Sequence, residues 1–507
     1  MNGESGATTS LWMATAEVPD FPPLRGDADV DVCIVGAGMA GLTTAYLLGR
    51  AGRRVLVLDD GAVGSGESGR TTAHLSNAFD DRYYAAERLH GARGARLIAE
   101  SHTSAIHRIA AIVQEESIDC DFARLDGWLF LAEGDSVDTL DRETEAAERA
   151  GLADVRREAS APLPFDSGPA LRFPGQGQFH PLRYLAGLAR AIVRDGGRIH
   201  TGSHVIEIDT SDERPRVVTE NGHSVHADAL VVATNSPINE WVAIHTKQAP
   251  YRTYVVALRV PDGAVPPGLY WDTGDPYHYV RLQRDGAGTL LIVGGEDHKT
   301  GQEHDGAERF ARLERWTRKR FPMAGEVAYR WSGQVLEPVD YVAFIGRDPT
   351  GQRNVYVATG DSGQGMTHGT IAGMLLTDLI LGHHNAWATL YDPSRKTLRA
   401  APEFVRENVN VAAQYADYVT RGDVGSEEEI RRGSGAVVRD GLRKLAVYRD
   451  EHGALHRRSA TCPHLFCVVD WNDTEKSWDC PCHGSRFDPY GNVLNGPAAA
   501  PLEEVEE

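Results

Sequence analysis

Four side chains near the end of the 507-residue chain combine residue types and spacing that suit metal binding. Cys462 and His464 form one pair, Cys480 and His483 form a second, and fifteen residues separate the two pairs. Two thiolates can hold one iron of a [2Fe–2S] cluster while two imidazoles hold the other iron. This order of ligands predicts an iron–sulfur cluster that carries one electron at a time.

Zinc is the alternative metal, because two thiolates and two imidazoles also make a tetrahedral zinc site. A zinc site does not explain two further cysteines, Cys467 and Cys482, each of which stands beside one of the pairs. We therefore favour the cluster and keep zinc as the alternative.

Residues 433–502 resemble a Rieske [2Fe–2S] domain of the type whose two cluster-binding loops are joined by a disulfide. The resemblance implies that Cys467 and Cys482 form this bridge, which serves the cluster even in a reducing compartment, where disulfides are rare. Ser485 matches the position whose hydroxyl donates to a bridging sulfide and raises the potential. Phe487 stands where the members of highest potential carry Tyr. Rieske centres span about −150 to +300 mV, so we expect a midpoint below the top of that range.

A cluster of this kind does no bond chemistry alone, so another part of the chain must supply or consume its electrons. Residues 30–59 have the pattern strand, glycine turn, helix, strand. The glycines permit a tight turn and the close approach of a pyrophosphate to the helix N-terminus, and the acid that ends the second strand takes ribose hydroxyls. The pattern predicts a Rossmann-like dinucleotide site formed by Gly36, Gly38, Met39, Ala40, Gly41 and Asp59.

A second GxGxxG match, at residues 64–69, has no strand before it, so we reject it as a separate dinucleotide site. We interpret it as a loop that brings four residues back toward the cofactor, namely Arg70, Thr71, Thr72 and His74.

Over about residues 28–390 the chain resembles the amine-oxidising flavoprotein family that includes D-amino acid, glycine and sarcosine oxidases. Five segments carry the similarity in family order: 68–71, 180–205, 230–235, 331–346 and 355–366. The resemblance implies FAD, and no second complete Rossmann unit predicts a pyridine-nucleotide site. It also implies further FAD contacts from strand ends and from the last glycine turn, namely Val205, Thr234, Gly360, Asp361, Gly363, Gln364, Gly365 and Met366.

In the resembled family a strand-rich second domain covers one face of the flavin and supplies substrate contacts. Tyr279 and Arg281 share one face of a predicted strand, and an Arg in this region of relatives grips a substrate carboxylate as a bidentate fork. An ordinary surface arginine is the alternative. No catalytic residue is identified, and the candidates are His74, Tyr279, Arg281 and Trp331. Some relatives attach flavin covalently through a nearby histidine, but the spacing of His74 differs by about one residue, so we expect noncovalent FAD.

These expectations give an α/β + β fold: a Rossmann-like FAD-binding domain with an interleaved strand-rich substrate domain, followed by a small all-β Rieske domain. We expect an N-terminal segment packed on the body at 1–27 and the oxidoreductase at 28–390, with the substrate domain at about 85–180 and 245–335. A helical linker at 391–429 and the Rieske domain at 430–507 would follow. Helices are predicted near 85–117, 135–150 and 392–420, and strands near 251–260, 277–282 and 290–294.

Composition limits the class of protein. A hydrophobic share of 41% and a charged share of 24% are typical of a globular chain, and the net charge of −20 makes nucleic acid and anionic membranes poor partners. No apolar run is long enough for a transmembrane helix, and the polar start is unlike a signal peptide, so we expect a cytoplasmic protein. Cys33 and Cys120 stand among apolar residues and are interpreted as core positions.

Rieske oxygenases pair their cluster with an iron held by two histidines and a carboxylate. His102 with His107, and His298 with His304, come nearest to this pattern, but neither pair has the spacing with its acid. We interpret these four as surface histidines.

The favoured hypothesis is an FAD-dependent dehydrogenase that oxidises a C–N bond of an amine or of an amino acid, N-methylated or not. Electrons would pass from the flavin through the Rieske cluster to an external one-electron acceptor. The first alternative reverses the flow, so that the cluster feeds a flavin reductase or monooxygenase. The second is an electron-transfer protein without a small-molecule substrate. The sequence identifies neither the substrate nor the acceptor.

Overall fold

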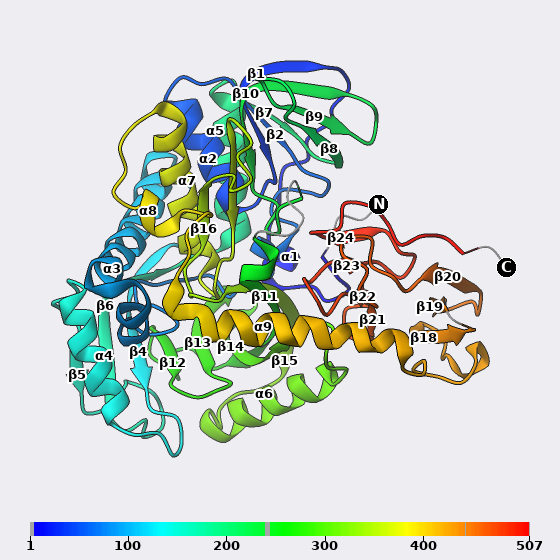
Figure 1. The fold of residues 1–507 in the computed structure, drawn as a ribbon. Helices are drawn as coiled ribbons and strands as arrows, with labels where there is room; N and C mark the ends of the chain where they lie inside the picture. Colours follow the sequence, from blue (N-terminus) through cyan, green and yellow to red (C-terminus); the bar gives the residue numbers. More distant parts are fainter. Residues whose placement is uncertain (1–4, 239–243, 442, 506–507) are drawn as a thin grey trace.

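The computed structural model describes residues 5–238, 244–441 and 443–505. Figure 1 shows two large sheets with their helices in the body of the molecule and a strand-rich terminal domain beside them. The predicted fold class is confirmed: a mixed α/β FAD-type fold precedes a separate all-strand domain.

The first sheet holds the dinucleotide turn. Its strands run in the order β16 (Phe344–Arg347), β17 (Val355–Thr359), β10 (Ser224–Val232), β1 (Ala28–Val35), β2 (Val55–Leu58) and β7 (Arg198–His200). The central strands are parallel, and a hairpin of β8 (Val205–Asp209) and β9 (Arg216–Thr219) extends from β10. Parallel strands are buried on both faces, which explains the continuous apolar runs in β1 and β2.

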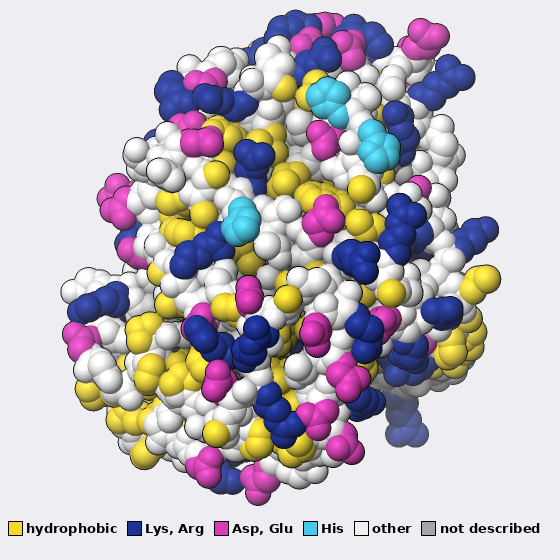
Figure 2. Space-filling view, turned by 90° about the vertical axis from the view of Figure 1, so that its left-hand side faces the viewer, with side chains coloured by type: hydrophobic (Ala, Val, Ile, Leu, Met, Phe, Trp, Pro, Cys, Tyr) yellow, Lys and Arg dark blue, Asp and Glu magenta, His cyan; other side chains and the backbone are white. Residues whose placement is uncertain are grey.

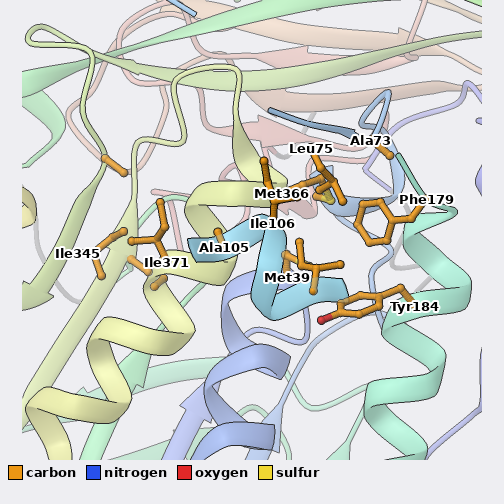
Figure 3. Close-up of a cluster of buried hydrophobic side chains, with 14 of the residues drawn as sticks. Met39, Ala73, Leu75, Ala105, Ile106, Phe179, Tyr184, Ile345, Met366 and Ile371 are labelled. Carbon is orange, nitrogen blue, oxygen red and sulfur yellow. The ribbon is translucent and has the colours of Figure 1, made fainter. Parts of the chain in front are cut away.

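Helices cover one face of this sheet: α2 (Met39–Arg50), α5 (Pro181–Arg194) and α7 (Gly365–Leu381). In Figure 3, Met39 of α2, Ile106 of α3 (Tyr83–Glu115) and Met366 of α7 lie in one cluster of buried side chains. A second apolar cluster lies on the opposite face and contains Leu24, Val205 and Val217. Cys33 and Cys120 are buried, as interpreted from the sequence.

The second sheet is interleaved with the first along the chain. Its order is β15 (Val327–Pro338), β11 (Gln248–Val260), β14 (Gly288–Lys299), β13 (His278–Asp285), β12 (Leu269–Asp272), β4 (Ala123–Phe130), β6 (Ala170–Gln178) and β3 (His74–Leu75), with β5 (Arg156–Glu158) on β6. Helix α6 (Gly306–Arg320) packs on β11 and β14, and α3 (Tyr83–Glu115) packs on α4 (Asp138–Arg149) and α7. The sequence analysis predicted β11, β13 and β14 of this sheet and did not predict its other strands, of which β12 and β3 are short and β4, β6 and β15 are long.

The terminal domain consists of two small antiparallel sheets. One contains β18 (Ser434–Asp440), β19 (Arg443–Arg449) and β20 (Leu455–Ser459). The other contains β21 (Asp470–Asn472), β22 (Ser477–Asp479), β23 (Arg486–Phe487) and β24 (Val493–Asn495). The metal-binding segments lie before β21 and between β22 and β23, so short strands hold both cluster loops.

A helix joins the body to the terminal domain, but the helix predicted over 392–420 is interrupted. The structure has α8 (Ala388–Tyr391), a non-helical stretch and then α9 (Ala401–Gln414), which Figure 1 shows running from the body toward β18 and β21. Pro393 disfavours helical backbone at Asp392, whose carboxylate instead accepts from the Ser394 N–H in a turn. Asn408 of α9 donates to the Thr246 carbonyl, which ties the linker to the body.

Charges are mixed over the surface in Figure 2, where Lys and Arg side chains alternate with Asp and Glu. None of the helices in the described ranges combines the length and apolarity that a bilayer crossing requires.

The interpretation of four histidines as surface residues is wrong for two of them: His102 is fully buried, and His298 is buried against Tyr254. Both lie among apolar or aromatic neighbours, which sequence spacing does not reveal.

Candidate flavin and iron–sulfur centres

The dinucleotide turn has the close approach that its glycines predict. A Cβ at Gly41 would lie 1.9 Å from the carbonyl oxygen of Gly36, so helix α2 can start here only without a side chain. The carboxylate of Asp59, at the end of β2, accepts from the Ala37 N–H at 2.5 Å and the Gly61 N–H at 2.8 Å. The turn, the helix start and the acid thus form one site at the edge of the sheet.

A cavity of about 630 Å³ lies between the two large sheets and contains most of the predicted FAD contacts. Its walls include Gly36, Gly38, Met39, Ala40, Asp59, Arg70, Thr71, Thr72, His74, Val205, Thr234, Asp361, Gly363, Gln364, Gly365 and Met366. Gly41 and Gly360 do not line it and support the turns behind it instead. A cavity of this size, with a helix N-terminus and an acid in its wall, fits a dinucleotide.

The catalytic candidates divide into two groups. His74 and Tyr279 line the cavity, with their ring centroids 5.7 Å apart. Burial and the nearby Arg281 guanidinium lower the pKa of His74 to about 3, so its imidazole is neutral at neutral pH. His74 therefore has no proton to give as a general acid there.

Arg281 and Trp331 lie outside the cavity wall. The surface alternative for Arg281 is wrong, because its side chain is fully buried and donates to the carbonyls of Thr72, Ala73 and Phe179. A further N–H donates to the Gln283 side chain. Arg281 therefore holds the loop of residues 70–74, here called the flavin loop, and its role toward a substrate stays a prediction. The Trp331 indole similarly donates to the Arg70 carbonyl at 2.8 Å.

Acidic side chains that the sequence analysis did not single out gather around the glycine turn at 360–365. Ser362 Oγ donates to Glu337 at 2.5 Å and contacts Asp81 at 3.4 Å, and Tyr277 donates to Asp80 at 3.0 Å. Burial, reinforced by Asp80, raises the pKa of Asp81 to about 8. Asp297 of β14 lines the same cavity. The doublet at 80–81 and the acid at 337 belong to no motif, so only the fold brings them together.

In the terminal domain the four predicted ligands are all nearly buried. The imidazole centroids of His464 and His483 are 5.1 Å apart, and Nδ1 of His483 is buried without a hydrogen-bond partner. The Cys462 and Cys480 thiols lie within hydrogen-bond reach of each other, so the two cysteine ligands stand side by side in the pocket. Two thiols and two imidazoles fit the [2Fe–2S] donor set.

Cys467 and Cys482 form the expected disulfide between the two loops. The sulfurs of Cys467, Cys480 and Cys482 lie within 4.8 Å of one another, but the bonded pair has no thiolate to offer a metal. The Ser485 hydroxyl interacts with the Cys462 sulfur and accepts from the Ala498 N–H at 3.1 Å. The bridge and Ser485 thus hold both loops around one pocket.

The cluster loops pack directly on the body of the molecule. Gln334 of β15 lines the large cavity, and its amide donates to the Gly484 carbonyl, beside the ligand His483, at 2.9 Å. A Cβ at Gly484 would lie 2.6 Å from the Pro250 Cβ, so the loop approaches β11 as closely as a glycine permits. His245, also from the body, places its ring 5.0 Å from that of His464.

A buried ion-pair network fastens the same interface. Glu475 of the terminal domain pairs with Arg70 of the flavin loop at 3.3 Å, and Asp479 pairs with Arg252 of β11 at 3.8 Å and with Arg486 at 3.0 Å. Burial alone would raise the pKa of Glu475, but the three guanidiniums outweigh it and hold the pKa below its usual value. Arg70 therefore also links the flavin loop to the terminal domain.

Comparisons with known proteins agree with both sites. Residues 31–379 match the model of the FAD dependent oxidoreductase family, and residues 420–506 match that of the Rieske [2Fe-2S] domain. The chain belongs to the FAD dependent oxidoreductase family. This member carries a C-terminal Rieske domain, and its cofactors are FAD and a [2Fe–2S] cluster. The cavity and the donor set above fit both groups. By its family and relatives, the oxidoreductase is of the amine and amino-acid oxidase kind.

Two relatives match much of the chain. The Rieske 2Fe-2S iron-sulfur protein YhfW of Bacillus subtilis is 34% identical, over 99% of this chain and 98% of its own length. Gamma-glutamylputrescine oxidoreductase of Escherichia coli is 30% identical, over 77% of this chain and 95% of its own. Among solved structures, glycine oxidase from Geobacillus kaustophilus superposes with a TM-score of 0.60 at 18% identity, covering 73% of this chain and 99% of its own, which shows the shared fold.

Proposed function

We propose that the protein oxidises a C–N bond of an amine or of an amino acid, N-methylated or not, and sends the electrons through its own cluster to an external one-electron acceptor. The observation that carries this proposal is the position of Gln334. Its side chain lines the flavin cavity and binds the carbonyl of Gly484 in the second cluster loop. One residue therefore contacts both redox sites.

Bound FAD supplies a two-electron acceptor for hydride from the carbon next to nitrogen, and the cluster supplies a one-electron carrier. The residues of the chain do the rest. Tyr279 and Thr253 are joined by a hydrogen bond of 2.8 Å in the wall formed by the second sheet. The acids of the cavity can receive the proton of an arriving ammonium. A neutral amine nitrogen then has the lone pair that C–N oxidation needs.

Gln334 and His245 support the relay in different ways. Gln334 fixes the separation between the cavity and the cluster loop, and His245 covers the imidazoles of His464 and His483 on the side of the body. Both ligand imidazoles are nearly buried and face protein. An electron can thus pass from the flavin cavity to the cluster through packed protein side chains.

The first experiment is an anaerobic screen of amines and amino acids, with flavin bleaching as the readout. Bleaching by an amine supports the proposed reaction. No bleaching by any amine, with flavin that dithionite still reduces, contradicts it and favours the reversed flow or a pure electron carrier.

The second experiment separates the relay from the oxidation. Cys480→Ser removes one cluster ligand, so amine should still bleach the flavin while turnover with a one-electron acceptor such as ferricenium falls to background. Absorbance of the bound flavin controls for folding of the body. Unchanged turnover in a variant shown by iron analysis to lack the cluster would refute the relay.

A further inference from the structure

The carboxylates in the flavin cavity have few cationic neighbours. Among the described residues that line the cavity, Arg70 is the only Lys or Arg. Its guanidinium is already bonded to the carbonyls of Gly6, Thr8 and Ser332 and paired with Glu475. Only its Nε–H lacks a partner, so Arg70 has no pair of N–H groups with which to hold a substrate carboxylate as a fork.

The three histidines of the cavity wall do not supply a positive charge for a substrate carboxylate either. Burial lowers the pKa of His74 to about 3 and that of His368 to about 4. His204 is paired with Asp60 at 3.4 Å. An anionic substrate group therefore meets no unpaired positive charge on the described walls.

Negative groups are abundant in the same space. Five carboxylates line the part of the cavity between the glycine turn at 360–365 and the second sheet: Asp80, Asp81, Asp297, Glu337 and Asp361. They lie near enough to raise one another's pKa, since Asp81, Asp80 and Asp361 all act on Glu337. The nearest cation, Arg82, donates to the main-chain carbonyls of Asp80 and Asp272.

Unpartnered buried atoms give a second, independent observation. His368 is 2% exposed and lines the cavity; its Nδ1 donates to the Asp361 carbonyl, so its Nε2 carries a lone pair that has no donor. Oδ1 of Asp297 is a second acceptor without a partner. Two acceptors of different chemical type, neither among the predicted FAD contacts, thus lack a donor around one space.

From this arrangement we infer that the substrate is a small organic cation with more than one amino group and with no carboxylate on the carbon that is oxidised. Ammonium groups supply both the charge and the N–H donors that these walls lack. A carboxylate beside the reacting carbon would be repelled by the acids and would find no arginine. The inference rests on the proposed function and narrows its substrate class from amines and amino acids to di- and polyamines.

Two matched pairs of compounds test the inference. The diamines 1,4-diaminobutane and 1,5-diaminopentane differ from ornithine and lysine, respectively, only in the carboxylate on one carbon. Anaerobic stopped-flow with the holoenzyme gives a dissociation constant for each compound from the saturation of the bleaching rate. We expect each diamine to bind at least about tenfold more tightly than its carboxylated partner.

Variants identify the residues responsible. Glu337→Gln and Asp81→Asn keep side-chain shape and relieve repulsion, so both variants should fold. The assays are made near about pH 9, above the raised pKa of Asp81, where each variant lacks a carboxylate charge that the parent protein can carry. Each should weaken diamine binding by about tenfold and leave binding of the amino acids unchanged or improved. Glu145→Gln removes an equal charge from a side chain that is 73% exposed and should change neither constant.

Three outcomes are distinguishable. Tighter binding of the diamines, lost in Glu337→Gln, supports the inference. Equal or tighter binding of ornithine and lysine overturns it while the proposed amine oxidation stands. If no compound of either pair and no other amine bleaches a flavin that dithionite reduces, both the inference and the proposed function are overturned.

Discussion

At the scale of single residues, the buried acids of the cavity control binding through their charge. Burial raises the pKa of Asp361 and of Asp297 to about 7, and burial together with Asp80 raises that of Asp81 to about 8. Arg82 opposes the shift at Asp80 and Asp81, and Tyr277 and Ser362 donate to acids of the same group. The acids are therefore largely protonated below neutral pH.

This titration predicts the pH dependence of diamine binding. Ammonium groups resembling lysine keep their proton to about pH 9, so affinity should rise from about pH 6 to about pH 9 as the acids ionise. The stability of the fold changes with pH in the opposite direction. Because the pKa of these acids is raised in the folded state, their contribution to the free energy of unfolding is present at low pH and is lost as pH rises through about 7 to 8. Dissociation constants across this range check the first statement, and an affinity that is flat or falls with pH contradicts it.

At the scale of loops and strands, the disulfide holds the two cluster loops together. Cys467 and Cys482 are separated by 15 positions, and closing a loop of that length stabilises a fold by about 3 kcal/mol. The double variant Cys467→Ala/Cys482→Ala should therefore lose its cluster at a lower denaturant concentration. Visible absorbance during a urea titration measures this, with flavin fluorescence of the same sample as the control. Retention of the cluster to the wild-type midpoint would show that the bridge does not clamp the loops.

The interface between the terminal domain and β11, β15 and the flavin loop depends on Glu475. Glu475→Gln leaves Arg70 without its carboxylate partner, while Arg252 and Arg486 keep Asp479. Breaking a buried pair costs about 3–5 kcal/mol. Since the pKa of Glu475 is lowered, this stabilisation is lost only in acid, as pH falls through the lowered pKa.

Chemical denaturation at neutral pH gives the free energy of unfolding of Glu475→Gln. The matched control is Asp473→Asn, which removes an exposed partner of Lys476 and should cost less than about 1 kcal/mol. Equal small effects from the two substitutions would show that the buried network does not hold the domains together.

At the scale of the whole molecule, the features that the sequence predicts are those formed by residues close together in the chain. The strand, glycine turn and acid around Gly36 and Asp59 depend on backbone geometry over thirty residues, and the four cluster ligands depend on spacing within two loops. The roles of Arg281 and Trp331 depend on what packs against them, so strand alternation alone does not predict that both serve the flavin loop. The acids at 80, 81 and 337 are far apart in sequence, and contact between Gln334 and Gly484 exists only in the folded chain.

The arrangement of the two domains supports the proposed transfer of electrons between the two redox sites of one molecule. The terminal domain contributes Asn495, Gly496 and Ala498 to the wall of the flavin cavity, while the body contributes His245 and Gln334 to the surroundings of the cluster. Each redox site is thus completed by residues of the other domain. Electron transfer between them is expected within one molecule.

The most direct measurement is the rate of cluster reduction after anaerobic mixing with an amine that bleaches the flavin. Rapid-scan absorbance, together with the electron paramagnetic resonance of freeze-quenched samples, follows flavin and cluster separately. The account predicts that the cluster is reduced after the flavin in a first-order step whose rate constant is independent of protein concentration. A cluster that stays oxidised beside reduced flavin, or a rate that scales with protein concentration, would contradict it.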